Sequence, residues 1–179
     1  MDGSIQLQDK TFVPFLRHAE ISAAISSVAE RINADYAGKK PLLVAVLNGS
    51  FMFAAELMKH LEINCEITFV KLASYHGVTS GGTVTELIGL NENLEGRDII
   101  VVEDIVDTGL TVQKVMDIFN SKKCSTVKVA SLLFKPSAYK GTHTIDYVAI
   151  EIPNKFIVGF GLDYNGLGRN LKDIYQIKN

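Results

Sequence analysis

Two hydrophobic rhythms alternate along this chain, one typical of buried strands and one typical of helices that cover a sheet. Runs of apolar, often β-branched residues predict strands at 42–47, 67–72, 83–88, 99–102, 127–134, 147–150 and 156–159. Apolar residues at i, i+3, i+4 spacing predict helices over 18–38, around 54–61 and around 112–119. Alternation of this kind predicts an α/β domain with a mostly parallel sheet covered on both faces. Ligands bind to such sheets beyond the carboxyl ends of the strands.

The most informative segment joins a predicted strand to a predicted helix through acidic and small residues. The strand Ile99–Val102 runs directly into Glu103 and Asp104, and Asp107-Thr108-Gly109 then turns the chain into the helix. Free backbone N–H groups and the dipole at a helix start favour a phosphate. The two acids cannot bind that phosphate, so they serve sugar hydroxyls, a metal ion or a proton in transit. A phosphorylated sugar bound with Mg²⁺ would use both features. The alternative is a plain buried strand with Asp107 as a helix cap.

Four further features fall at the same predicted edge of the sheet. The turn Leu47–Ser50 has small residues that let backbone N–H groups approach an anion. The segment Ser74–Gly82, rich in glycine and hydroxyl residues, is expected to be an exposed loop, either a linker or a lid. Lys135 either snorkels to the surface or donates to a carbonyl oxygen of a ligand. Phe156 is either core or a ring that stacks on a planar base.

Length and composition fit one domain spanning residues 1–179. The chain is 47% apolar and 21% charged, and its net charge of −2 without a basic run argues against a nucleic-acid partner. No apolar run is long enough for a membrane span, and the N-terminus lacks a signal-peptide pattern. Cys65 and Cys124 stand alone, so we expect reduced, buried thiols in a cytoplasmic protein. The histidines, expected at the surface, lack metal-ligand spacing, and no zinc site is predicted.

Five motifs occur in an order that resembles the hypoxanthine and hypoxanthine-guanine phosphoribosyltransferases of the type I phosphoribosyltransferase family. They are Val46–Phe53, Ser74-Tyr75, Ile99–Thr111, Ser131–Lys135, and Ile152–Phe156 followed by Arg169–Leu171. The resemblance covers most of residues 18–177. It implies a type I phosphoribosyltransferase fold, with a central mostly parallel sheet flanked by helices and a small hood made by the terminal segments.

The resemblance also implies an activity. The family transfers 5-phosphoribosyl from 5-phosphoribosyl-1-pyrophosphate (PRPP) to a 6-oxopurine base, with Mg²⁺. Hypoxanthine, and guanine as a second base, would give IMP or GMP and pyrophosphate in purine salvage. A homodimer or homotetramer is expected from the resemblance alone.

The residues that the resemblance implies fall into two sets. The substrate-binding set is Leu47, Asn48, Gly49, Ser74, Tyr75, Glu103, Asp104, Asp107, Thr108, Gly109, Leu110, Thr111, Lys135, Phe156, Ile157, Asp163 and Arg169. The Mg²⁺ set is Glu103, Asp104 and Asp163. By resemblance, the two adjacent acids hold the ribose hydroxyls, directly or through Mg²⁺, and the turn Asp107–Thr111 cradles the 5′-phosphate. Leu47–Gly49 and Arg169 face the pyrophosphate.

The remaining implied roles concern the base and the chemistry. Lys135 donates to the purine 6-oxo group, Phe156 stacks on the ring, and the backbone of Ile157 reads the 2-position. Ser74-Tyr75 belongs to the lid. Asp107 is the expected general base, which takes a proton from the purine N7 as N9 attacks C1′. Because no residue resembles a covalent nucleophile, direct displacement is expected.

One departure and two alternatives stay open at this point. Asn48 stands where many family members carry Lys, which makes the expected pyrophosphate pocket less positive. The base could instead be xanthine, adenine or a pyrimidine, although Lys135 favours a 6-oxopurine because an ammonium group and a 6-amino group are both donors. A protein of another class, a regulator that senses PRPP or nucleotides, would keep the fold without the activity.

Overall fold

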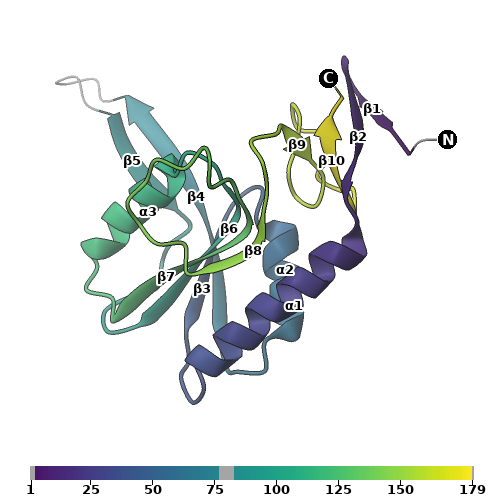
Figure 1. The fold of residues 1–179 in the computed structure, drawn as a ribbon. Coiled ribbons are helices and arrows are strands. Elements are labelled where there is room, and N and C mark those ends of the chain that lie inside the picture. The colour runs from purple at the N-terminus through teal and green to yellow at the C-terminus, as the bar shows by residue number, and fades with distance from the viewer. Residues whose placement is uncertain (1–2, 77–82, 179) are drawn as a thin grey trace.

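The computed structural model describes residues 3–76 and 83–178, which form a main sheet and a smaller sheet at the two ends of the chain (Figure 1). The strands are β1 (Ile5–Leu7), β2 (Lys10–Leu16), β3 (Leu42–Val46), β4 (Glu66–His76), β5 (Thr83–Ile88), β6 (Asp98–Val106), β7 (Thr126–Phe134), β8 (Tyr147–Glu151), β9 (Ile157–Val158) and β10 (Ile174–Ile177). The helices are α1 (His18–Asp35), α2 (Phe51–His60) and α3 (Leu110–Asn120). None of the described helices is long and apolar enough to cross a membrane.

The main sheet is mostly parallel, as the sequence predicts. Its strand order is β5-β4-β3-β6-β7-β8. The five strands β4, β3, β6, β7 and β8 are parallel, and β5 pairs antiparallel with β4 at the edge. All residues of β3 are buried, because a central strand is covered on both faces and therefore reads as a continuous apolar run. Parallel pairing places the carboxyl ends of β3, β6 and β7 at one edge.

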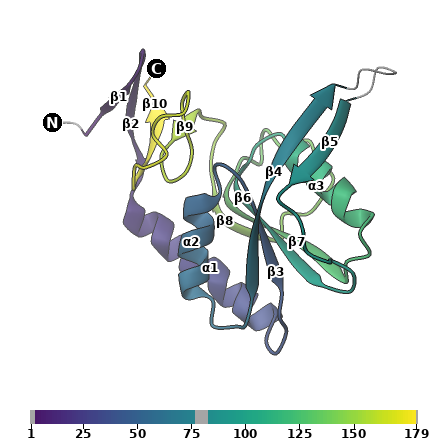
Figure 2. The ribbon, with the colours of Figure 1, turned by 180° about the vertical axis from the view of Figure 1, so that it is seen from behind.

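Helices cover both faces of the main sheet (Figure 2). On one face, residues of α1 and α2 pack against alternate residues of β3 and β6, among them Ile25, Ile32, Leu57, Leu43 and Ile100. On the other face, α3 packs against the intervening residues, among them Val115, Phe119, Val44 and Val101. The α/β fold predicted from alternating strands and helices is confirmed.

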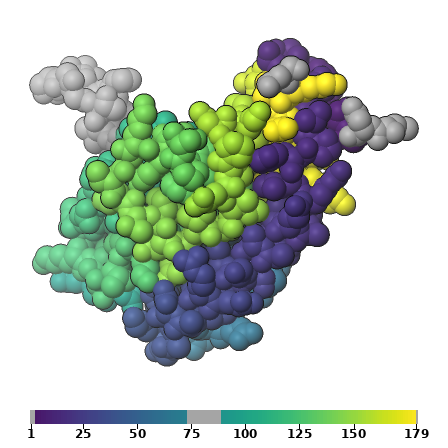
Figure 3. All heavy atoms as spheres, viewed as in Figure 1, coloured from purple at the N-terminus to yellow at the C-terminus, as the bar shows by residue number. Residues whose placement is uncertain are grey.

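The smaller sheet, which we call the hood, has the antiparallel order β1-β2-β10-β9 and brings the two ends of the chain together. Figure 3 shows the purple N-terminal atoms against the yellow C-terminal atoms. Asp173 fastens this junction, since its carboxylate accepts hydrogen bonds from His18 N at 2.8 Å and Arg17 Nη1 at 3.2 Å. The hood itself is implied by the family resemblance. Hydrophobic periodicity predicts only β9 of its four strands, and it misses β1 and β10, which have 3 and 4 residues, as well as β2.

The strand β6 is longer than the sequence predicts. It continues through Glu103 and Asp104 to Val106, where it pairs with Phe134 of β7. The prediction that the acids follow the strand is therefore wrong. They lie in its last part, because the parallel ladder with β7 extends that far. Their side chains still reach the carboxyl edge of the sheet.

The strand β4 is also longer than predicted. Ser74 and Tyr75 continue the strand and pair with Thr85 and Val84 of β5, so the prediction of a loop at these positions is wrong. The strand predicted at 83–88 is confirmed. Residues 77–82, the rest of the predicted lid, lie outside the described residues.

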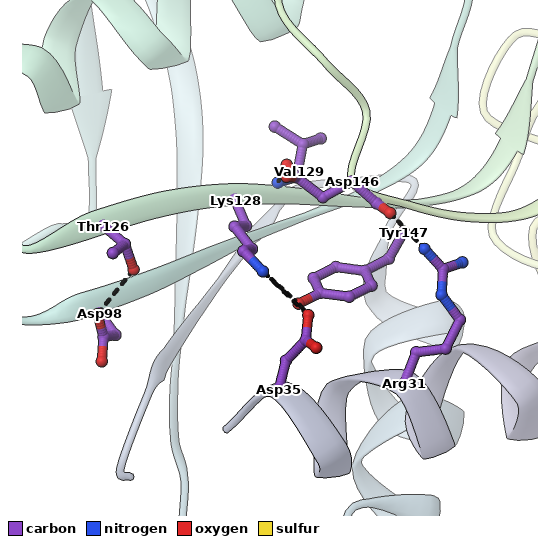
Figure 4. A network of polar contacts seen from close by, with 8 residues as sticks. All are labelled: Arg31, Asp35, Asp98, Thr126, Lys128, Val129, Asp146 and Tyr147. Atoms are coloured by element: carbon purple, nitrogen blue, oxygen red, sulfur yellow. Dashed lines mark hydrogen bonds and ion pairs between the residues drawn. The ribbon is translucent and has the colours of Figure 1, made fainter. Parts of the chain in front are cut away.

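A polar cluster joins α1 to the amino ends of β7 and β8 (Figure 4). Asp35 Oδ2 accepts hydrogen bonds from the Tyr147 hydroxyl at 2.6 Å and from Lys128 Nζ at 2.9 Å. Lys128 Nζ also donates to the Tyr147 hydroxyl at 3.0 Å. Arg31 donates to the backbone oxygen of Asp146 at 2.6 Å. These contacts fix the end of α1 on the sheet, at the edge opposite the candidate site.

Tyr147→Phe should lower the free energy of unfolding by about 1–2 kcal/mol, because the change leaves Asp35 and Lys128 each without one partner. Urea denaturation measures this quantity. The matched control is Tyr175→Phe, since no hydrogen bond joins the Tyr175 hydroxyl to any described residue. Equal losses of unfolding free energy in the two variants would show that the hydrogen bonds of the Tyr147 hydroxyl do not stabilise the fold.

Candidate active site

Two adjoining cavities lie where the carboxyl edge of the main sheet meets the hood. The first, which we call the turn cavity, has a volume of about 230 Å³ and is lined by residues 103–112. The second, the hood cavity, has a volume of about 190 Å³ and is lined by the end of β6, by Lys135 just after β7, and by residues within 155–163, in and next to the hood, including Phe156. Asp104, Ile105 and Asp107 line both. The two cavities therefore form one continuous site.

Of the acid pair, Glu103 is buried and Asp104 is half-buried. The side chain of Glu103 is 4% exposed, and its Oε1 has no hydrogen-bond partner among the described residues. Burial, and then the charge of Asp104, raises the pKa of Glu103 well above its ordinary value. Burial also raises the pKa of Asp104 to about 6, although the Ile105 N–H donates to its carboxylate at 2.8 Å. Buried carboxylate oxygens without partners are suited to receive a ligand's hydroxyl groups or a cation.

The turn that follows the acids is supported from behind by an aromatic ring. Gly109 has a φ of 89° and precedes α3, whose first N–H groups have no partners within the helix. A Cβ atom at Gly109 would overlap the ring of Tyr139. The Tyr139 hydroxyl donates to His143 O at 2.6 Å, and Lys140 N donates to Thr108 O at 3.2 Å. The loop after β7 thus holds the turn in place while its other side lines the turn cavity.

Lys135 and Asp107 form an ion pair between the two cavities. Lys135 Nζ lies 2.6 Å from Asp107 Oδ2 and 3.3 Å from Asn154 Oδ1. The Lys135 side chain is 7% exposed and that of Asp107 is 44% exposed. Lys135 is therefore not a snorkelling surface residue, which excludes one of the two interpretations that the sequence left open. Its ammonium group lies at the base of a ligand cavity.

Arg169 and Asp163 reach the acid pair from a loop of the hood. Arg169 Nη2 lies 2.5 Å from Asp163 Oδ1, and Arg169 Nη1 donates to Gly161 O at 2.6 Å. A Cβ atom at Gly161 would overlap the backbone oxygen of Gly49, so the loop rests directly on the turn after β3. The charges of Arg169 and Asp163 act on the pKa of Asp104 in opposite directions.

The turn after β3 approaches the acid pair very closely. The Leu47-Asn48 peptide bond is cis, a property that the sequence does not reveal. Ser50 Oγ donates to Val46 O at 2.6 Å and holds the turn on the end of its strand. A Cβ atom at position 49 would overlap the Asp104 carboxylate, so any larger residue there would displace that side chain. Asn48 is exposed.

Phe156 and Ile157 occupy different environments in the hood. Phe156 is 48% exposed and lines the hood cavity, whereas Ile157 is 5% exposed and belongs to the hydrophobic core. Phe156 is therefore not ordinary core. The strand predicted at 156–159 is β9, which begins at Ile157, one residue later than predicted. A half-exposed ring at a cavity wall presents a flat apolar face to a ligand.

Some predicted residues are not brought together, and some lining residues were missed. Ser74 and Tyr75 are placed as backbone positions of β4 only. No three His, Cys, Asp or Glu residues of the described ranges form a group that could hold a metal ion by themselves. Lys155 and Leu162 also line the hood cavity, and no sequence signal marks them. Tyr139 was likewise missed.

The cysteines and most of the histidines are half-buried. Cys65 and Cys124 are free thiols of intermediate exposure, so the prediction of reduced thiols is met but that of full burial is wrong. The prediction of surface histidines is also wrong for His18, His60 and His143, each of which buries a ring nitrogen. His76 lies at the end of β4, and its side chain is outside the described part of the chain.

Gly109→Ala should lower the free energy of unfolding by several times more than Gly96→Ala. Both glycines have positive φ, 89° and 72°, which an alanine adopts only with strain. At Gly96 no atom lies within 4 Å of an added Cβ, whereas at Gly109 the Tyr139 ring must move. Equal losses of stability in urea denaturation would show that the ring does not support the turn.

Asp104→Asn should stabilise the fold by an amount that depends on pH. Because the pKa of Asp104 is raised from 3.8 to about 6, the folded protein keeps a proton in this interval that the unfolded chain has released. The ionised form therefore lowers the free energy of unfolding as pH rises through the interval. The advantage of the variant over the wild type should grow across it and then stay constant. A difference independent of pH would contradict the burial of this carboxylate.

Comparisons with known proteins agree with this geometry. The phosphoribosyl transferase domain family matches residues 15–165. The hypoxanthine-guanine phosphoribosyltransferase of Streptococcus agalactiae is 46% identical over 160 residues, which cover 89% of this chain and 89% of that protein.

Solved structures show the same relationship. The structure of a hypoxanthine-guanine phosphoribosyltransferase from Bacillus anthracis matches with a TM-score of 0.83 and 34% identity, over 92% of this chain and 96% of that chain. A hypoxanthine phosphoribosyltransferase from Staphylococcus aureus matches with a TM-score of 0.84 and 33% identity, over 92% and 90%. With both sequence and fold shared over most of its length, the chain belongs to the type I phosphoribosyltransferase family, in its hypoxanthine-guanine branch.

Proposed function

We propose that this protein transfers the 5-phosphoribosyl group of PRPP to hypoxanthine, and to guanine, and releases pyrophosphate. The observation that carries the proposal is the continuity of the two cavities, one beside a phosphate-type turn and one with a buried ammonium group at its base. A ribose placed between them would have its 5′-phosphate on one side and the incoming base on the other. The names of the relatives support the same activity.

The turn cavity suits a phosphorylated ribose. The N–H groups of the turn Asp107–Thr111 and the start of α3 offer donors and a positive dipole end to the 5′-phosphate. Glu103 and Asp104 lie directly before the turn in β6 and offer buried carboxylate oxygens to the ribose hydroxyls. Arg169 and the turn Leu47–Gly49 are the proposed neighbours of the pyrophosphate.

The hood cavity suits a flat base with a carbonyl group. Phe156 offers its exposed ring face for stacking, and the backbone of Ile157 is the proposed reader of the 2-position. Lys135 carries only donors, so it favours the 6-oxo group of hypoxanthine or guanine over the 6-amino group of adenine. Hypoxanthine and guanine differ only by the 2-amino group of guanine. Because both carry the 6-oxo group, Lys135 can donate to either base.

Asp107 is the proposed general base. Its carboxylate lines both cavities and accepts a hydrogen bond from Lys135, which holds it beside the base. The purine N9 attacks C1′ as the bond from C1′ to the pyrophosphate oxygen breaks, and the N7 proton passes to Asp107. Pyrophosphate leaves with the electrons of the broken bond, and Arg169 stabilises its charge.

Mg²⁺ is the proposed cofactor, and the donor set fits it. Glu103 Oε1 is buried without a partner among residues 3–76 and 83–178, and the neighbouring Asp104 supplies a second hard oxygen ligand. Mg²⁺ is commonly held by one or two carboxylates together with substrate oxygens, so a complete protein cage is not required. Asp163 is a third proposed ligand, although Arg169 pairs with it in this structure. The ion would neutralise negative charge on PRPP and the departing pyrophosphate.

The wider setting is also proposed. A homodimer or homotetramer is expected from the family alone, and a cytoplasmic location is supported by the two free thiols. A xanthine-preferring enzyme and a PRPP-sensing regulator are the alternatives. The assembly of Lys135, Asp107 and Arg169 around one site favours catalysis, because a sensor needs no group placed to receive a proton.

The wild-type protein with Mg²⁺ and PRPP should release pyrophosphate rapidly with hypoxanthine and guanine, and hardly at all with adenine. Lys135→Met keeps the apolar stem of the side chain but removes the ammonium group. This variant should lose about 10- to 100-fold in kcat/KM for hypoxanthine, the value of a charged hydrogen bond, and its preference over adenine should shrink. Pyrophosphate release with hypoxanthine, guanine, xanthine and adenine in turn measures both effects.

Lys155→Met is the matched comparison, because Lys155 lines the same cavity without an ion pair to any described residue. It should leave the preference between hypoxanthine and adenine unchanged. No pyrophosphate release by the wild type with any of hypoxanthine, guanine or xanthine would overturn the enzyme proposal in favour of a sensor. Full discrimination by Lys135→Met would overturn the role of Lys135.

A further inference from the structure

The ring of Phe156 is held from behind by two aromatic rings that the proposed reaction does not use. Its centroid lies 5.9 Å from that of Tyr164, with the rings at 87°, an edge-to-face contact. Phe12 of β2 lies 6.3 Å away and is fully buried. Phe12 and Tyr164 also contact each other at 5.9 Å. The three rings form a cluster, which we call the aromatic triad, and Phe156 is its member at the hood cavity.

Tyr164 is itself tied to the turn of the N-terminal hairpin. Its hydroxyl donates to Asp9 Oδ1 at 2.8 Å, a contact between residues 155 positions apart. Asp9 lies between β1 and β2, so the hydrogen bond joins the hairpin turn to the loop that carries Asp163 and Arg169. The bond lowers the pKa of Asp9 and raises that of Tyr164. Both groups are exposed to solvent, yet they hold one specific orientation.

We propose that Tyr164, fixed by Asp9, is a positioning residue that sets the orientation of Phe156 and thereby the affinity for the base. The inference deepens the proposed function and rests on it, because Phe156 matters to affinity only if a base stacks there. The N-terminal hairpin thus belongs to the base site although it carries no group that touches the substrate.

The physical reason is preorganisation. A side chain that is 48% exposed keeps considerable rotamer freedom, and a ligand that stacks on it must pay the entropy of fixing it. The triad fixes the ring before the base arrives, so less binding free energy is lost. Because the rings of Tyr164 and Phe156 are in edge-to-face contact, a movement of the Tyr164 ring would shift the Phe156 ring directly.

A purely structural role would have a different signature. A second bond, from Asn165 Nδ2 to Gln8 Oε1 at 3.0 Å, also ties the hairpin to the same loop. It lies next to the Asp9–Tyr164 bond and joins two side chains outside the triad, although Asn165 also interacts with the Tyr164 hydroxyl and lowers its pKa. If the hairpin only needs to be fastened, cutting either bond should have the same effect on the protein.

The experiment measures KM for hypoxanthine, KM for PRPP, kcat and the thermal midpoint of a set of full-length variants. Tyr164→Leu removes the ring, and it should raise KM for hypoxanthine about 3- to 10-fold, the value of an aromatic pair. Tyr164→Phe and Asp9→Ala cut only the hydrogen bond, and each should raise it about 2- to 5-fold. Asp9→Asn keeps an acceptor oxygen, so its KM for hypoxanthine should equal that of the wild type. KM for PRPP should stay within about twofold in all of them, because the Tyr164 ring packs on Phe12 and Phe156, while the Asp163–Arg169 ion pair of the same loop keeps its own contacts.

Gln8→Asn is the control. It withdraws the acceptor from Asn165 while retaining a residue type that tolerates the φ of 49° at position 8. It should leave KM for hypoxanthine unchanged, whatever it does to the thermal midpoint. If Tyr164→Leu does not fold, Tyr164→Phe and Asp9→Ala still test the inference.

The outcomes separate the inference from the function on which it rests. No transfer by the wild type would overturn the proposed function, and the inference with it. An active wild type whose Tyr164 and Asp9 variants change KM for both substrates equally, or change neither, would overturn the inference alone. Equal effects of Gln8→Asn and Asp9→Ala on KM for hypoxanthine would likewise reduce the pair to a fastening of the hairpin.

Discussion

Parallel pairing of β3, β6 and β7 is the constraint on which the rest of the site depends. Parallel strands end at one edge, so the turn after β3, the acids of β6 and Lys135 after β7 arrive side by side from distant parts of the sequence. The apolar runs of these strands allow burial between two helical layers, which fixes their register. The hood then closes the edge and supplies Phe156, Asp163 and Arg169.

Burying the acid pair costs electrostatic free energy, which other contacts in the fold offset. Burying Glu103 and Asp104 beside each other raises the pKa of both carboxyls, which means that their ionised forms are disfavoured in the folded protein. The polar cluster around Asp35 lies at the opposite edge of the sheet, whereas both hydrophobic cores extend to the site: Val106 and Val112 line the turn cavity, and Ile157 and Leu162 line the hood cavity. This packing supports the edge, where Glu103 Oε1 has no partner among the described residues and can receive a substrate or a cation.

Local chemistry was predictable from the sequence, whereas tertiary partners were not. The strand, the acid pair and the Asp-Thr-Gly turn are contiguous in residues 99–111, so hydrophobic period and turn chemistry predicted the strand and the following helix without a structure. The pairing of Lys135 with Asp107 needed the fold, because it joins the ends of two strands 28 residues apart. Tyr139 behind Gly109, and Asp9 on Tyr164, leave no periodic signal at all. Of the hood strands, β1 and β10 were too short to show one, with 3 and 4 residues.

A structure of the protein in complex with IMP would probe both cavities at once, since one ligand would span them. We expect the 5′-phosphate on the turn Asp107–Thr111, the ribose hydroxyls toward Glu103 and Asp104, and the 6-oxo group within hydrogen-bond distance of Lys135 Nζ, with Phe156 stacked on the purine. A nucleotide bound with its base away from the hood cavity, or with its phosphate away from the turn, would contradict this expectation.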